Sequence, residues 1–125
     1  MLTSKNAVAT IAVKSVNAAR TFYGDVLGLT IEETPEKGVI GLKSGATSLL
    51  VYESEFAGTN KATAATWIVG TDLDAIVSTL KERGVTFEHY DFPGTTRKGD
   101  IHEAGNMRVA WLKDPDGNIL SLVNG

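Results

Sequence analysis

An internal repeat constrains the fold of this chain more than any other feature of its sequence. The segment LGLTIE, from Leu27 to Glu32, matches RGVTFE, from Arg83 to Glu88, at an offset of 56 residues. In both copies, a helical pattern of apolar residues precedes the match, and a strand-like pattern precedes the helix. The sequence therefore predicts two copies of one small module.

Each copy contains one amphipathic helix. The first is expected from Val16 to Leu27 and the second from Asp72 to Arg83, with apolar residues recurring every three or four positions. Ser15 can cap the first helix at its N-terminus. Gly28 and Gly84 follow the two helices at equivalent positions of the repeat, and glycine commonly ends a helix because it tolerates the left-handed conformation.

Strands complete the two copies. In the first copy they are expected at Val8–Lys14, Thr30–Glu33, Gly38–Lys43 and Ser48–Glu53. In the second copy they are expected at Ala65–Gly70, Val85–Glu88, Met107–Lys113 and Ile119–Val123. The predicted fold is α+β: two βαβββ modules, at about 6–53 and 64–123 of one domain spanning 1–125, with mixed sheets curled around a shared cleft. The polar segment Tyr90–Gly105 is expected to be a long loop.

Composition excludes several classes of partner. The formal net charge is -3, so there is no basic face for nucleic acid and no polybasic stretch for a membrane surface. No apolar run approaches membrane-spanning length, and the N-terminus lacks a signal-peptide pattern. The absence of cysteine excludes disulfides and thiolate metal sites. These features predict a cytoplasmic protein.

Four segments resemble the vicinal oxygen chelate superfamily, which includes glyoxalase I, bleomycin-resistance proteins and extradiol dioxygenases. They are FYGDVLGL at 22–29, DLDA at 72–75, GVTFE at 84–88 and AWLKDPDGN at 110–118. The order and paired spacing of these segments carry the resemblance, which covers nearly the whole chain. It implies paired βαβββ modules, assembly as a homodimer, and, in the enzymes of the family, a divalent metal held by His and Glu.

The family's metal positions fall on residues that are poor metal ligands. They correspond here to Val8, Leu50, Ala65 and Ser121, which offer neither imidazole nor carboxylate. Positions one residue away do not rescue the site; these are Ala9, Leu49, Val51, Thr66, Leu120 and Leu122. Both histidines, His89 and His102, lie outside these strands and are expected to be solvated loop residues. We therefore expect no metal, no cofactor and no catalytic residue.

Strand alternation predicts what lines the cleft instead. If Val8, Leu50, Ala65 and Ser121 face it, Thr10, Tyr52, Trp67 and Ile119 face it too. The predicted ligand-binding residues are Thr10, Leu50, Tyr52, Trp67, Ile119 and Ser121. An apolar and aromatic lining with few hydroxyls suits a small hydrophobic or aromatic molecule. Core or interface packing is the competing interpretation for Tyr52, Trp67 and Trp111.

Three functions remain open from the sequence. The first is a metal-free protein of the glyoxalase/bleomycin-resistance type that binds or sequesters an apolar or aromatic ligand in the inter-module cleft. The alternative is a metal-dependent lyase, isomerase or dioxygenase whose ligands are displaced. The third is an accessory domain that acts through protein contacts.

Overall fold

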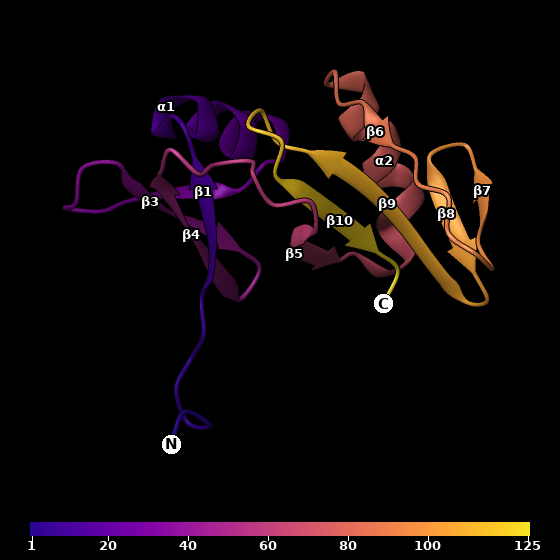
Figure 1. Ribbon diagram of the computed structural model, residues 1–125, viewed down its shortest axis with the longest axis horizontal. Coiled ribbons are helices and arrows are strands. Elements are labelled where there is room, and N and C mark those ends of the chain that lie inside the picture. The colour runs from indigo at the N-terminus through magenta and orange to yellow at the C-terminus, as the bar shows by residue number, and fades with distance from the viewer. The chain divides into compact units, whose positions relative to one another are not determined.

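The computed structural model describes all residues from Met1 to Gly125 and divides them into two compact units, Met1–Thr59 and Asn60–Gly125 (Figure 1). Each unit holds one mixed sheet and one main helical segment. The predicted α+β class with two mixed sheets is confirmed. None of the helices has both the length and the apolar character needed to cross a membrane.

The first unit has the predicted order of elements. These are β1 (Ala9–Val13), α1 (Val16–Ala19), η1 (Arg20–Val26), β2 (Thr30–Glu33), β3 (Val39–Ser44) and β4 (Thr47–Glu53). The strand order is β1-β4-β3-β2, with β1 and β4 parallel and the other pairs antiparallel. The two chain segments that pair in parallel are therefore the first and last strands of the unit, joined through the helix and a β-meander.

The helical segment of the first unit begins and ends close to the predicted residues, but its backbone hydrogen bonding changes from α-helical to π-helical within the segment. The Ser15 Oγ accepts a hydrogen bond from the Ala18 N–H at 3.3 Å and so caps the helix. After Ala19 the helix continues as a π-helix. Gly28 follows with a φ of 78°, which glycine adopts without steric cost. The prediction of one regular α-helix was wrong in this respect, since residue spacing does not distinguish the two bonding patterns.

Alternation along β1 separates two faces. Ile11 and Val13 are buried, whereas Val8 just before the strand and Thr10 are exposed. Tyr23 of the helix is fully buried, as are Leu42 of β3 and Val51 of β4. The apolar face of the sheet and the helical segment therefore form the core of this unit.

The second unit repeats the plan and adds two strands. Its elements are β5 (Thr63–Ile68), η2 (Gly70–Asp72), α2 (Leu73–Glu82), β6 (Phe87–Glu88), β7 (Thr96–Lys98), β8 (Ile101–Ala104), β9 (Met107–Lys113) and β10 (Ile119–Val123). The strand order is β5-β10-β9-β8-β7, with β5 and β10 parallel, and β6 also pairs with β9. The second helix ends at Glu82, and Gly84, two residues later, has a φ of 90°.

The prediction that Tyr90–Gly105 is a loop was wrong, because this segment contains β7 and β8. The β7–β8 turn and the β8–β9 turn each begin with a glycine of positive φ, which is Gly99 at 62° in the first and Gly105 at 60° in the second. Such glycines favour tight two-residue hairpins. All three residues of β7 are polar and exposed, so the sequence lacks the alternation of apolar and polar residues by which a strand is predicted.

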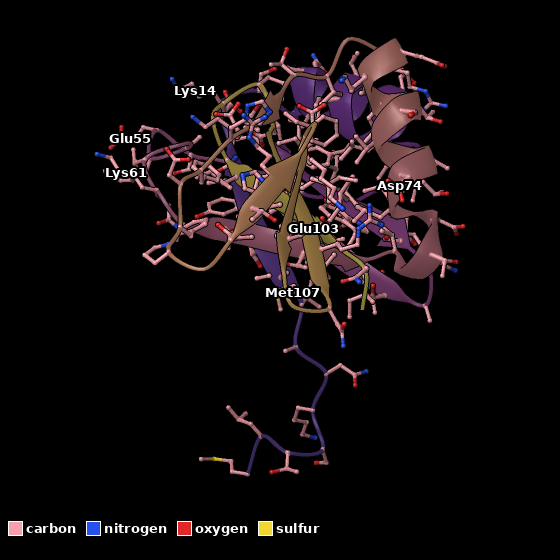
Figure 2. All side chains as sticks on the ribbon, turned by 90° about the vertical axis from the view of Figure 1, so that its right-hand side faces the viewer. Lys14, Glu55, Lys61, Asp74, Glu103 and Met107 are labelled. Carbon is pink, nitrogen blue, oxygen red and sulfur yellow. The ribbon has the colours of Figure 1, made fainter.

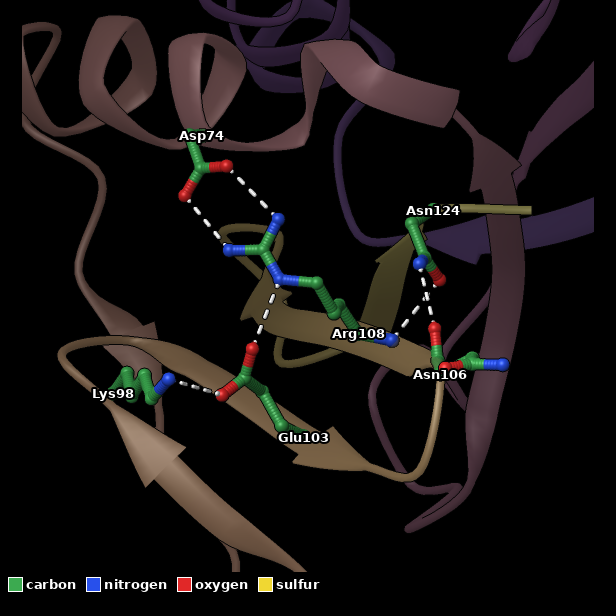
Figure 3. A network of polar contacts seen from close by, with 6 residues as sticks. All are labelled: Asp74, Lys98, Glu103, Asn106, Arg108 and Asn124. Atoms are coloured by element: carbon green, nitrogen blue, oxygen red, sulfur yellow. Dashed lines mark hydrogen bonds and ion pairs between the residues drawn. The ribbon is translucent and has the colours of Figure 1, made fainter.

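A polar network ties the added strands to the helix (Figure 3). The Arg108 guanidinium on β9 donates to both Asp74 carboxylate oxygens on α2, each at 2.9 Å, and to Glu103 Oε2 on β8 at 3.2 Å. Glu103 also lies 3.3 Å from the Lys98 Nζ on β7. The contact with Arg108 holds the pKa of Asp74 below its usual value. One cation therefore links a helix and two strands.

Candidate functional site

The sheet of the second unit has α2 on one face; the other face, which no helix of the unit covers (Figure 1), is called the open face, although Ser121 and His102 on it are buried. Ser121 of β10 lies opposite Trp111 of β9 and beside Thr66 of β5, while His102 of β8 lies opposite Val109. Paired residues of neighbouring strands project to the same side of a sheet. The alternate residues, such as Leu112, are buried with Leu73, Val77 and Leu80 of α2. The first set therefore lines the open face.

A hollow of about 360 Å³ lies on this open face. Its apolar lining comes mainly from Phe92, Met107, Val109, Trp111 and Val123. Its polar lining comes from Thr63, Thr95, His102, Glu103 and Ser121. Figure 2 shows Glu103 and Met107 on the β8–β9 hairpin, with Asp74 on α2. The charge of Glu103 is paired with Arg108 and Lys98, so the hollow is dominated by apolar surface.

Aromatic rings gather around Trp111. The His102 ring lies edge-on to it, with centroids 4.8 Å apart and planes at 75°. Tyr90 meets the same indole at 5.2 Å and 77°, and Phe92 lies at 5.5 Å. Edge-to-face pairs at these distances are favourable arrangements. Trp111 is half-buried and Phe92 is 48% exposed, so the cluster presents aromatic surface to solvent.

His102 is buried, with 1% of its surface exposed, so the prediction of a solvated loop histidine was wrong. The Tyr90 backbone N–H donates a hydrogen bond to His102 Nε2 at 3.0 Å. No hydrogen-bond partner reaches His102 Nδ1 or the Tyr90 hydroxyl, although both atoms are buried. His102 and Tyr90 also line a second hollow of about 390 Å³, together with Phe92 and Arg97.

The residues at the family's metal positions do not fit a metal. Ser121 is 4% exposed, and its Oγ lies 2.6 Å from the Thr66 Oγ1, so the two hydroxyls bond to each other. Neutral hydroxyls are weak ligands for the metals that imidazole and carboxylate hold. No three His, Cys, Asp or Glu side chains form a group that could bind an ion. The absence of a metal itself stays a prediction.

The structure brings some predicted site residues together and separates others. In the first unit, Thr10 of β1 pairs with Leu50 of β4, and Ala12 of β1 pairs with Tyr52 of β4. Thr10, Leu50 and Tyr52 therefore lie on one face of that sheet. Ile119 and Ser121 lie on the open face of the second unit. Trp67 is opposite Leu122, on the other face, so the expectation that Ala65 and Trp67 share a face with Ser121 was wrong. The ligand-binding role of all six stays a prediction.

The sequence reasoning missed the aromatic residues that surround the hollow. Trp111 could have been found, because the tight turn from Asp114 to Asn118 makes β9 and β10 a hairpin and sets Trp111 opposite Ser121. Tyr90, Phe92 and His102 came from the segment interpreted as a loop. Their meeting depends on the pairing of β8 with β9, which no local pattern indicates.

The Asp114 carboxylate accepts hydrogen bonds within the turn between β9 and β10. The Asp114 Oδ1 accepts hydrogen bonds from the backbone N–H groups of Asp116 and Asn118, each at 2.9 Å. Its Oδ2 accepts a bond from the Asn118 side chain at 2.7 Å. This carboxylate therefore holds the turn between β9 and β10.

Asp100 anchors the β7–β8 turn to the rest of the unit. Its Oδ2 lies 2.8 Å from the Lys81 Nζ on α2, and its Oδ1 lies 2.8 Å from the His89 Nε2. Lys81 first, and His89 second, lower the pKa of this carboxyl from its usual value. The hairpin that carries His102 is therefore fixed by an ion pair at its turn.

Comparison with known proteins identifies the family. Three similar solved structures are a lactoylglutathione lyase from Agrobacterium tumefaciens, the fosfomycin resistance protein FosX from Listeria monocytogenes and an integron cassette protein from V. cholerae. Their TM-scores are 0.70, 0.67 and 0.63, with identities of 16%, 15% and 20%. The matches cover 96%, 98% and 98% of this chain, and 92%, 91% and 98% of the other chains.

At these identities, the structures show a common fold only. No curated protein sequence matched the chain. The family model described as Glyoxalase/Bleomycin resistance protein/Dioxygenase superfamily matches residues 6–122, which is nearly the whole chain. The chain therefore belongs to the glyoxalase/bleomycin resistance protein/dioxygenase superfamily.

Proposed function

We propose that this protein binds and sequesters a small apolar or aromatic molecule, without metal chemistry, on the open face of its second unit. The observation that carries the proposal is the hollow beside Trp111, with Phe92, Met107 and Val123 in its lining. Ligand sites are typically concave, mostly apolar and equipped with a few polar groups. The volume of about 360 Å³ suits a compact molecule.

The chemistry of the lining favours binding over catalysis. A nucleophilic serine needs a neighbouring base, and Ser121 bonds to another hydroxyl, that of Thr66. The alternative, a metal-dependent lyase, isomerase or dioxygenase with displaced ligands, needs a group of imidazoles and carboxylates that these residues do not supply. No observation favours that alternative. The contribution of Thr10, Leu50 and Tyr52 to binding stays a prediction.

Tryptophan fluorescence tests the proposal directly. The chain has two tryptophans, so Trp67→Phe leaves Trp111 as the only indole reporter. Titration of this variant with naphthalene should change the Trp111 emission saturably, because a bound ring replaces water beside the indole. Elemental analysis of untagged protein should find no stoichiometric Zn, Fe, Mn or Ni. An unchanged emission across a panel of one- and two-ring aromatic compounds would contradict binding, and one metal ion per chain would contradict the metal-free part.

We also propose assembly as a homodimer. The first strand of each unit, β1 or β5, lies at the edge of its sheet and leaves backbone groups available for pairing. Sedimentation of the full chain should give twice its mass of 13.3 kDa. A single-chain mass at high micromolar concentration would contradict this assembly.

A further inference from the structure

The unpaired polar atoms beside Trp111 suggest what the bound molecule must carry. The Tyr90 N–H occupies the lone pair of His102 Nε2, which must therefore be the unprotonated nitrogen of the ring. A neutral imidazole then carries its proton on Nδ1. This N–H has no hydrogen-bond partner, although only 1% of the surface of His102 is exposed. Buried donors in folded proteins are nearly always paired, so this one needs an explanation.

A ligand acceptor supplies that explanation. His102 lines both hollows, so a molecule in either can approach its ring. The second unpaired atom, the Tyr90 hydroxyl, belongs to a ring 6.4 Å from the imidazole centroid. An N–H donor and a hydroxyl beside one aromatic surface match a ring system that carries an oxygen or nitrogen acceptor.

The surrounding charges favour a neutral molecule. Glu103 is paired with Arg108 and Lys98. Asp91 and Arg97 both line the second hollow, so neither sign of charge dominates there. The rings of Trp111, Tyr90 and Phe92 offer stacking and edge contacts to a flat molecule.

We propose that His102 is the polar anchor of the hollow, donating its Nδ1–H to a neutral, flat aromatic ligand that carries a carbonyl oxygen or a ring nitrogen. This inference rests on the proposed binding function and adds the ligand class. A ligand acceptor would pair the Nδ1–H, which otherwise has no hydrogen-bond partner. A ligand with such an acceptor should therefore bind more tightly than a ligand of the same shape without one.

Quinoline and naphthalene form a matched pair of probes, since they share a shape and differ by one ring nitrogen. At neutral pH, where quinoline is uncharged, the protein should bind quinoline about tenfold more tightly than naphthalene. His102→Met keeps a weak acceptor, its sulfur, near the Tyr90 N–H and has no side-chain donor at all, so it should bring this ratio to about one. Phe56→Ala is the control, because Phe56 is exposed and lines neither hollow.

Nitrogen NMR of the parent protein gives a second readout that does not depend on the folding of the variant. Quinoline should shift the protonated Nδ1 resonance of His102, and naphthalene should leave it nearly unchanged. Equal affinity for both probes, a preference retained in His102→Met, or an unperturbed Nδ1 with quinoline bound would overturn the anchor while leaving the binding function intact. Failure of both probes to bind would overturn the anchor together with the hollow as a binding site.

Discussion

The two units share one plan but treat their second strand, β2 or β6, differently. In the first unit, β2 pairs with β3 along four residues, from Thr30 to Glu33. In the second unit, β6 pairs with β9 over only two residues, and β8 takes the remaining edge of β9. Ile31 opposite Leu42 corresponds to Phe87 opposite Leu112, with Ile31 and Phe87 matched in the repeat. Of these shared positions, Leu42, Phe87 and Leu112 are buried and Ile31 is half-buried, whereas the segment in which the units differ contributes to the candidate site.

This difference shows how a duplicated module can gain an aromatic surface. The segment between β6 and β9 adds a hairpin to the sheet, and its residues Tyr90, Phe92 and His102 meet Trp111. The core on the other face keeps its plan, because Ala110 and Leu112 of β9 and Leu120 and Leu122 of β10 are buried, as are Leu73, Val77 and Leu80 of α2. An insertion at a sheet edge therefore alters the open face and leaves the packed face alone.

The largest expected effects come from the shared core positions. Leu42→Ala and Leu112→Ala each remove a leucine that is 1% exposed or less, from equivalent strands. Each change should lower the free energy of unfolding by about 2–5 kcal/mol, through lost burial and a residual cavity. Denaturant unfolding of the two variants and the parent protein measures these losses. A loss below about 1 kcal/mol at either position would break the equivalence of the two cores.

A second comparison separates the aromatic cluster from an ordinary exposed ring. Phe92 in the second unit is 48% exposed and Phe56 in the first unit is 69% exposed. Phe92→Ala should weaken binding of an aromatic probe about tenfold, or about 1.4 kcal/mol, because it removes part of the lining. Phe56→Ala is the control and should leave affinity unchanged. Equal affinity in the two variants, measured by Trp111 fluorescence, would place the ligand elsewhere.

A third comparison uses matched hairpin turns. Gly45 joins β3 to β4 with a φ of 57°, and Gly105 joins β8 to β9 with a φ of 60°. An added Cβ meets no atom within 4 Å at either site, so only backbone strain opposes it. Alanine at each position should cost about 1 kcal/mol of unfolding free energy.

Binding distinguishes these two turn variants. Gly105→Ala should also weaken probe binding, since its turn adjoins Ala104 and Met107 in the lining of the hollow. Gly45→Ala should not affect it. Equal probe affinity in the two variants would show that the β8–β9 turn does not shape the site.

The smallest effect is expected at the anchor of the added hairpin. Asp100→Asn should cost about 0.2–1 kcal/mol at neutral pH, as is usual for an ion pair with exposed partners. The folded-state pKa of Asp100 is lowered, so its contribution is present above the unfolded-state pKa and disappears as the pH falls through the folded one. The stability difference between parent and variant should therefore shrink below about pH 4. A difference that grows in acid would contradict this role.

Much of the fold could be predicted from local patterns. The repeat around Gly28 and Gly84 indicated the two modules, and the helix ends followed from Ser15 and these glycines. All eight predicted strands form, although β6 is shortened to Phe87–Glu88. These features depend on periodicity and on residues with special backbone freedom, which are local properties of a chain.

The site depended on contacts that local patterns do not encode. A register shift between Ile119 and Leu120 places Thr66, and not Ala65 or Trp67, beside Ser121. A shift of one residue moves every side chain of a strand to the opposite face, so the predicted lining of β5 was reversed.

By itself, the sequence determined the duplicated α+β plan and the core alternation, whereas the loss of the family's metal ligands stays a prediction. Only the tertiary structure decided that β7 and β8 form, that His102 is buried, and that its ring meets Trp111. The physical reason is that short polar strands form by pairing with a neighbour already in place. Their order depends on hydrogen bonds and ring contacts between residues distant in the chain.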